Sequence, residues 1–165
     1  MATMTMPKVT EAHRQLERLV GAWSGEERLY PSPFDPQGGA AVGRVRNRLA
    51  LDGFAVVQDY EQERDGAIGF RGHGVFRWDA DDRSYALHWF DSLGLAPSEF
   101  RGGFEGDVLT LVNAGPQGVT RAVFELRGDD SYVYRMQVSP DGSNWFPFME
   151  GTYAREDGRP IERSG

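Results

Sequence analysis

The spacing of apolar residues changes once along the chain, at Gly21. Before that point apolar residues recur at helical intervals, and Thr10 and Gly21 are residue types that begin and end helices. We therefore predict one short helix over residues 7–20, and we expect His13, on its polar side, to be solvated. The apolar stripe of this helix, which should cover part of a core, consists of Ala12, Leu16, Leu19 and Val20.

The segment after Gly21 has the pattern of an all-β domain. Apolar and polar residues alternate with the two-residue period of strands, and turn-forming residues interrupt the alternation roughly every ten residues. No spacing typical of βαβ units is present. We predict an all-β fold, a single antiparallel up-and-down β-barrel of about ten strands with one short N-terminal helix. One domain should cover residues 1–165, with the barrel over about residues 22–155 and a polar tail at 156–165.

The dipeptide Asp52-Gly53 is a strong signal for a two-residue hairpin turn, and it sets the register of the flanking strands. One face of that hairpin is a ladder of opposite charges, which pairs Arg46 with Asp59 and Arg44 with Glu61. Such a ladder belongs in solvent, so the other face should point inward. That inward face pairs Leu51 with Phe54, Leu49 with Val56, Asn47 with Gln58, and Val45 with Tyr60.

The inward face of this hairpin becomes polar away from the turn, through Asn47, Gln58, Tyr60 and Gln62. A dry core disfavours such groups, because each unpaired polar group costs about 1–3 kcal/mol when it is buried. Two interpretations stay open. Either these amides line a cavity that holds water or a ligand, or they lie at a wet rim of the barrel.

Residues 69–91 predict a second hairpin, with its loop at residues 79–82. Its inward face carries most of the aromatic mass and pairs Trp78 with Arg83, Phe76 with Tyr85, Gly74 with Leu87, and Gly72 with Trp89. The two glycines leave space beside large rings. The opposite face makes His73 and His88 direct neighbours, but its other residues are not metal ligands, so we predict no metal site there. The alternative to a metal site is a surface or dimer-contact pair of neutral imidazoles.

Two carboxylates are weak catalytic candidates. Asp91 is expected inside the barrel beside Trp89, and Glu150 is flanked by bulky apolar residues; either group in an apolar wall could act as an acid or a base. For Asp91 the favoured alternative is an Asx-turn in the loop that follows it. Arg135 would pair with a ligand carboxylate if it points inward, but the pattern leaves its direction open.

Composition excludes several classes of function. The chain has no Cys, which removes disulfides, thiolate metal sites and Cys nucleophiles. Its net charge of −7 argues against a nucleic-acid partner. No secretory signal or membrane-spanning apolar run is present, so we expect a soluble, cytoplasmic protein without a membrane partner. A homodimer stays open.

The segment Gly21-Ala22-Trp23-Ser24-Gly25 resembles the Gly-x-Trp signature of lipocalins and other calycins. The resemblance implies that Trp23 closes one end of the barrel and that Arg155, near the end of the last strand, packs over its ring. With Tyr30-Pro31, Gly72-His73-Gly74-Val75 and Trp89-Phe90-Asp91-Ser92, the longer pattern is similar to a bacterial family of calycin-like barrels of unknown function. It also resembles the nitrobindin-like barrels, which bind haem through a late His. This chain has no His after His88, so we expect no haem and no other cofactor.

Three functions follow as hypotheses. The first is binding of a small, mostly apolar molecule inside the barrel, with an unknown ligand. The second is an enzyme that uses the cavity for acid or base chemistry, such as cyclisation, isomerisation or hydrolysis. The third is a structural or interaction barrel whose core is filled. For the first, the expected contacts are Asn47, Gln58, Tyr60, Phe76, Tyr85, Trp89 and Asp91.

Overall fold

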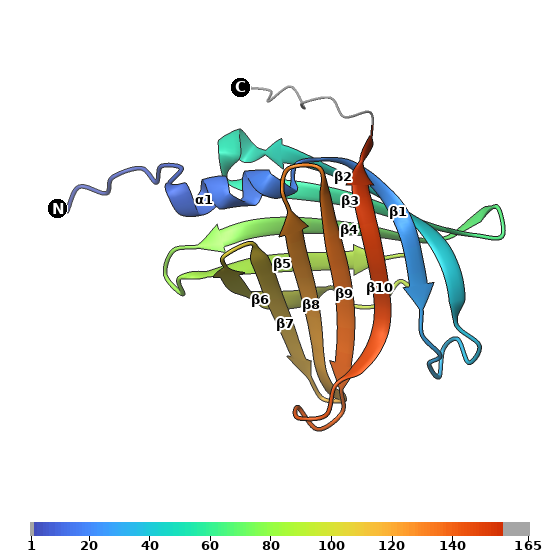
Figure 1. The fold of residues 1–165 in the computed structure, drawn as a ribbon. Coiled ribbons are helices and arrows are strands. Elements are labelled where there is room, and N and C mark those ends of the chain that lie inside the picture. The colour runs from blue at the N-terminus through green and yellow to red at the C-terminus, as the bar shows by residue number, and fades with distance from the viewer. Residues whose placement is uncertain (1, 157–165) are drawn as a thin grey trace.

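The alternating segments form ten antiparallel strands that close into a barrel, with one short helix at one end (Figure 1). This computed structural model describes residues 2–156. The helical elements are α1 (Glu11–Gln15) and two 3₁₀ turns, η1 (Leu16–Leu19) and η2 (Leu51–Gly53). The strands are β1 (Gly21–Leu29), β2 (Gly39–Ala50), β3 (Ala55–Arg64), β4 (Ala67–Asp79), β5 (Ser84–Asp91), β6 (Ser98–Glu105), β7 (Val108–Gly115), β8 (Gly118–Arg127), β9 (Ser131–Ser139) and β10 (Phe146–Arg155).

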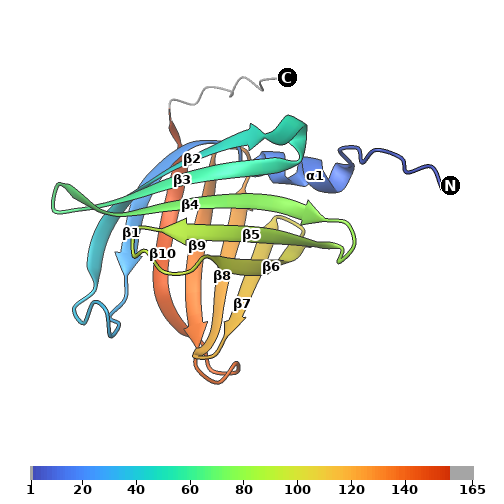
Figure 2. The ribbon, with the colours of Figure 1, turned by 180° about the vertical axis from the view of Figure 1, so that it is seen from behind.

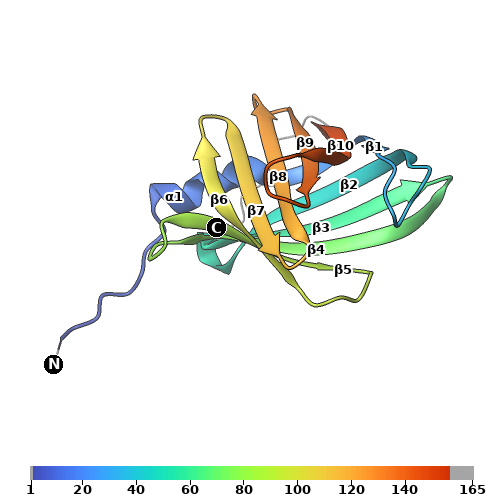
Figure 3. The same cartoon turned by 90° about the horizontal axis from the view of Figure 1, so that it is seen from below.

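The topology is up-and-down, as the turn spacing predicts. Each strand pairs with its neighbours in sequence, and β1 closes the barrel against β10. Strands β2–β5 and β7–β10 form two walls that cross at a steep angle (Figures 2 and 3). The predicted fold class is confirmed. The predicted polar tail lies, apart from Glu156, outside the described residues.

The helix begins later than its sequence pattern predicts, because Thr10 is its cap. The backbone N–H of Thr10 donates to Nδ1 of His13 at 3.0 Å. The prediction of a solvated His13 is wrong: the residue is buried, and its ring meets Phe54 edge-on with centroids 5.1 Å apart. Burial, with a smaller contribution from the charge of Arg14, lowers the pKa of His13.

Trp23 lies at the end of the barrel that the helix covers. It is 2% exposed, and its indole N–H donates to the carbonyl of Leu19 at 3.0 Å. The guanidinium carbon of Arg155 lies 4.1 Å from the ring centroid, and the same guanidinium donates to the carbonyls of Val20 and Asp129. This is the contact that the calycin resemblance implies, and it joins the first strand, the last strand and the helix at what we call the closed end.

The predicted register of the β2–β3 hairpin is confirmed for the cross-strand pairs from Arg44–Glu61 to Leu49–Val56. Arg46 and Asp59 lie outside the barrel, and Arg44 forms its ion pair with Glu63 instead of the predicted Glu61. Leu51 departs from the prediction, because it takes a positive φ of 53° in the turn and is 72% exposed. A residue in that conformation cannot continue the inner face of the strand.

The β4–β5 hairpin differs from its predicted register by two residues. Asp79 pairs with Ser84, so the loop is residues 80–83. The carboxylate of Asp79 accepts the backbone N–H groups of Asp81 and Asp82, both at 3.1 Å, and this holds Asp79 at the base of the loop. A two-residue shift preserves the faces, so the inward face is as predicted.

The histidines of this hairpin are not the direct neighbours that the predicted register makes them. His73 faces Phe90 across the strands and His88 faces Val75. Nδ1 of His73 lies 2.8 Å from a carboxylate oxygen of Asp59. Nε2 of His88 accepts a hydrogen bond from Nε of Arg77 at 2.9 Å. Each imidazole therefore has a partner of its own on the outer surface.

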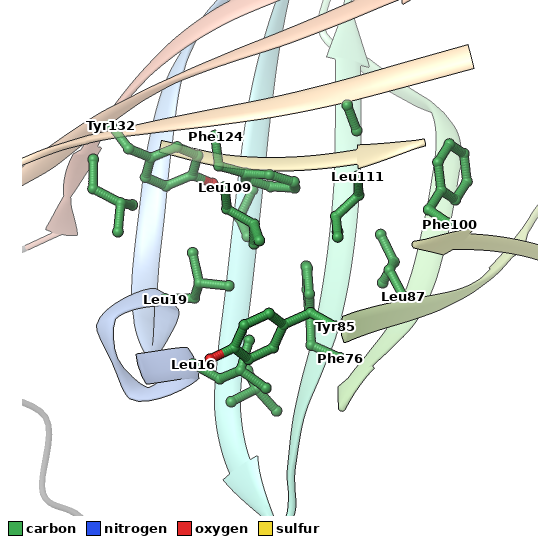
Figure 4. Packing of buried hydrophobic residues seen from close by; sticks show 14 of the residues in the cluster. Leu16, Leu19, Phe76, Tyr85, Leu87, Phe100, Leu109, Leu111, Phe124 and Tyr132 are labelled. Atoms are coloured by element: carbon green, nitrogen blue, oxygen red, sulfur yellow. The ribbon is translucent and has the colours of Figure 1, made fainter. Parts of the chain in front are cut away.

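The interior is packed most tightly in the half of the barrel next to the helix. Leu16 and Leu19 of η1, each 1% exposed, close this half from the side of the helix (Figure 4). Next to them, side chains from all ten strands meet in one cluster, which includes Phe76, Leu109, Phe124, Leu126 and Tyr132. The other half, which we call the open half, contains inner-face side chains that are only partly buried, among them Phe70, Trp89, Tyr134 and Met136.

Candidate functional site

The residues expected to line one cavity are divided between the two halves of the barrel. Phe76 is 0% exposed and Tyr85 is 6% exposed, and both lie in the packed cluster of Figure 4. The Tyr85 hydroxyl donates to the carbonyl of Ala12 at 2.6 Å, which ties β5 to the helix. Tyr85 therefore supports the helix, and both side chains are part of the packed core.

Asn47 and Gln58 face each other inside the barrel, between its two halves. The Asn47 amide donates to the carbonyl of Leu19 at 2.8 Å, and this carbonyl fixes which end of the amide is the nitrogen. The remaining oxygen, Oδ1, is buried and has no hydrogen-bond partner among residues 2–156. Buried acceptors are normally satisfied, so this oxygen calls for a donor from water or a ligand.

Trp89 and Asp91 lie in the open half and contact each other. The indole N–H of Trp89 donates to one carboxylate oxygen of Asp91 at 3.0 Å, and the backbone N–H of Leu93 donates to the other at 3.0 Å. The second bond is an Asx-turn, the favoured alternative to a catalytic role. The Trp89 ring fills the space over Gly72 and Gly74, where an added Cβ would overlap it or press against it.

Glu150 and Arg135 lie on the outer face of the barrel. Arg135 pairs with Glu125 at 2.9 Å and with Glu150 at 3.4 Å, and the Tyr30 hydroxyl donates to Glu150 at 3.2 Å. Arg135 thus faces the outer surface, and its charge is already paired. Glu150, whose side chain is 41% exposed, does not sit in an apolar wall.

Sequence reasoning missed the most unusual carboxylate of the interior, Glu27. It is 3% exposed, and its oxygens accept hydrogen bonds from the hydroxyls of Tyr60, at 2.6 Å, and Tyr153. The amide of Gln62 donates to it at 3.1 Å. Gly43 of the neighbouring strand makes room, because a side chain there would overlap the carboxylate. The sequence did contain an indication, because Glu27 lies four residues after the inward Trp23 and strand alternation places both on the same face.

The tyrosines around Glu27 stay protonated. Burial, and next the nearby charge of Glu27, raise the pKa of Tyr60 and of Tyr153 far above the ordinary value. Both hydroxyls are therefore permanent donors to the carboxylate. No cationic side chain lies within ion-pair distance of Glu27 among the described residues. The result is a buried carboxylate held by neutral groups alone.

Glu27 lines an open hollow of about 990 Å³ where the end of β1, the start of β2 and β10 meet. Ala41 and Gly151 of the adjoining strands line the same hollow. A smaller hollow of about 450 Å³ lies over β3, β4 and β5, beside His73 and the half-exposed Phe90. The larger hollow is lined by the buried carboxylate of Glu27, so it is the better candidate for a binding site.

Nowhere in residues 2–156 do three His, Cys, Asp or Glu side chains gather as a metal ion would require. None of the helices in this range has the length and apolarity needed to cross a membrane.

Comparisons with known proteins agree with this architecture. The model of a family described as "Protein of unknown function (DUF1579)" matches residues 8–155. No curated protein matches the sequence. Among solved structures, Rv2717c from M. tuberculosis is similar with a TM-score of 0.69 and 16% identity, over 90% of this chain and 99% of that one.

A second solved structure is the S-type phycobiliprotein lyase CPES from Guillardia theta. Its TM-score is 0.61 at 11% identity, over 88% of this chain and 93% of the lyase. Both neighbours are calycin-like barrels. At such low identities these likenesses establish the shared barrel fold, and residue roles must be argued from this chain itself.

Proposed function

The chain belongs to the DUF1579 family, which has no assigned function, and from this premise we propose that its barrel binds a small, mostly apolar molecule that enters at the open half. The observation that carries the proposal is Glu27, a carboxylate that is 3% exposed inside an apolar barrel and lines a hollow. A buried carboxylate costs several kcal/mol unless it is paired, so a purely structural barrel gains little from keeping one there.

Tyr134 of β9 supports the same proposal, since it lies level with Glu27 on the other side of Gly151 of β10. The residue is only partly buried, and its ring packs against Phe124 with centroids 4.9 Å apart. One side of this ring is therefore available to a ligand in the open half. Trp89 and Phe70, also partly buried, supply apolar surface in the same half. A few polar groups in an aromatic setting are the usual composition of a small-molecule site.

A filled structural or interaction barrel is the second candidate. The complete burial of Phe76, Leu109 and Leu111 favours it, because the half next to the helix is packed by the protein's own side chains. The two candidates differ in the open half. A binding protein has space there, and a structural barrel does not.

The test is binding of the neutral fluorescent probe N-phenyl-1-naphthylamine to the purified chain, together with native mass spectrometry for a co-purified molecule. Met136→Trp places a large ring on the inner face of β9, opposite Ala122, and should weaken probe binding by about tenfold or more. Val123→Trp, on the outer face next to Ala122, is the matched control and should bind normally. Absence of probe binding by the folded wild-type chain would overturn the proposal.

A further inference from the structure

We propose that the ligand carries a positively charged, hydrogen-bond-donating nitrogen, an amine on an apolar body, which Glu27 binds directly. This inference rests on the proposed binding function and names the class of molecule that the site accepts. Its basis is the number of donors around Glu27, the kind of polar group that the interior leaves unsatisfied, and the charge of the hollow.

The carboxylate of Glu27 has more capacity to accept hydrogen bonds than its neighbours use. Tyr60, Tyr153 and Gln62 are its donors. Each hydroxyl has one proton, and the Gln62 amide also donates to the Tyr60 oxygen at 3.0 Å. An ionised carboxylate offers about four acceptor positions, and only three protons meet them, because Tyr60 shares one proton between both oxygens. Because all three donors are neutral, the charge of Glu27 is also uncompensated.

The one buried side-chain atom without a hydrogen-bond partner in residues 2–156 is also an acceptor. Asn47 Oδ1 is buried without a hydrogen bond, and the bond from the Asn47 nitrogen to the carbonyl of Leu19 excludes the reversed amide. Gln58 of β3, opposite Asn47, and Tyr60, two residues further along, lie on the same inner face, and Tyr60 donates to Glu27. Asn47 Oδ1 and Glu27 are therefore both acceptors, and a protonated amine supplies donors only.

The hollow beside Glu27 repels anions. Four other acidic residues line it, and Arg28 is its one basic lining residue. Glu63 and Glu150 among the four are paired with Arg44 and Arg135, which do not line the hollow. An acidic wall attracts cations and disfavours carboxylates and phosphates. A fatty acid is therefore a poor match for this opening, and a long-chain amine of the same length is a good one.

The experiment compares three competitors with one ten-carbon chain, decylamine, decan-1-ol and decanoate, in displacing N-phenyl-1-naphthylamine from the wild-type chain at neutral pH. Decylamine should displace the probe at about tenfold lower concentration than decanol, since a charge-assisted hydrogen bond replaces a neutral one. Decanoate should be the weakest competitor. A decylamine no better than decanol would overturn the inference, and the probe signal would still show that the binding function stands.

Glu27→Gln keeps the shape of the side chain and removes its charge. In this variant decylamine should lose its advantage over decanol, whereas decanol itself should compete as before within about threefold. Glu61→Gln removes a carboxylate from the outer face of β3, beside Tyr60, and should leave the preference for the amine intact. An unchanged preference in Glu27→Gln would contradict the inference. If Glu27→Gln does not fold, the wild-type ranking of the three competitors still decides the question.

Discussion

The Tyr60 hydroxyl lies 2.6 Å from a carboxylate oxygen of Glu27, although the two residues are 33 positions apart and belong to strands that are not adjacent. The contact crosses the inside of the barrel over Gly43 of β2, the strand that lies between β1 and β3. It joins the walls of the open half by a hydrogen bond to a buried charge, a kind that is stronger than one between neutral groups.

Tyr60→Phe should therefore destabilise the protein by about 1.5–3 kcal/mol, because it removes a donor from a buried carboxylate. Tyr30→Phe is the matched control, since its hydroxyl donates to the half-exposed Glu150, where water can replace it; that change should cost less than about 1 kcal/mol. Urea unfolding followed by circular dichroism measures both. Equal losses in the two variants would show that Glu27 is solvated.

Trp23→Ala should destabilise the protein by about 3–5 kcal/mol, because it leaves a cavity at the closed end. Trp145 gives a control with similar chemistry, since the guanidinium of Arg121 lies 3.9 Å from its ring centroid, but the residue is only partly buried. Trp145→Ala should cost about 1 kcal/mol or less. Thermal unfolding separates the two, and a mild effect at Trp23 would contradict its role as the plug of the barrel.

Gly72→Ala should push the Trp89 ring away from β4, because the added methyl group overlaps it. We expect a loss of about 1–3 kcal/mol and a change in tryptophan emission, as overpacking predicts. Gly69→Ala, on the same strand, adds a methyl group that meets nothing within 4 Å, and it should be close to neutral. If both variants behave alike, the ring does not rest on Gly72 in solution.

His13 should make stability depend on pH. Burial lowers the pKa of His13 in the folded state below the ordinary histidine value of 6.5, so the unfolded chain binds the proton more readily. The contribution of neutral His13 to folding stability is fully present above pH 6.5. It is lost as the pH falls through 6.5 towards the lower pKa of the folded state. His13→Gln keeps an acceptor for Thr10 and should lose less stability than the wild type between about pH 7.5 and 5.5.

The sequence specified the faces of the strands better than the depth of each residue along the barrel. Alternation and the Asp52-Gly53 turn were enough to place Asn47 and Gln58 opposite each other inside. Alternation distinguishes inner from outer positions but not the packed half from the open half. Phe76 and Tyr85 were therefore assigned correctly to the interior, although the docking of the helix, which placed them in the filled core, was outside the reach of the pattern.

Two other differences have local causes. The β4–β5 loop offers several Asp residues, and only the hydrogen bonds to the Asp79 carboxylate decide which of them begins the loop. Glu27 has inward parity, but a carboxylate is ordinarily expected in solvent, and its burial depends on tyrosines from β3 and β10. Contacts between strands so distant in sequence are not contained in any local pattern.

The pairing of β1 with β10, in which Trp23 faces Arg155, has a consequence for how the chain matures. On the ribosome, the first strand must wait for the last before its free edge is satisfied, and such long-range closure slows folding. During that interval the unpaired edges of β1 and of the growing sheet can recruit other chains. A nascent chain that stalls before residue 146, where β10 begins, is therefore expected to aggregate.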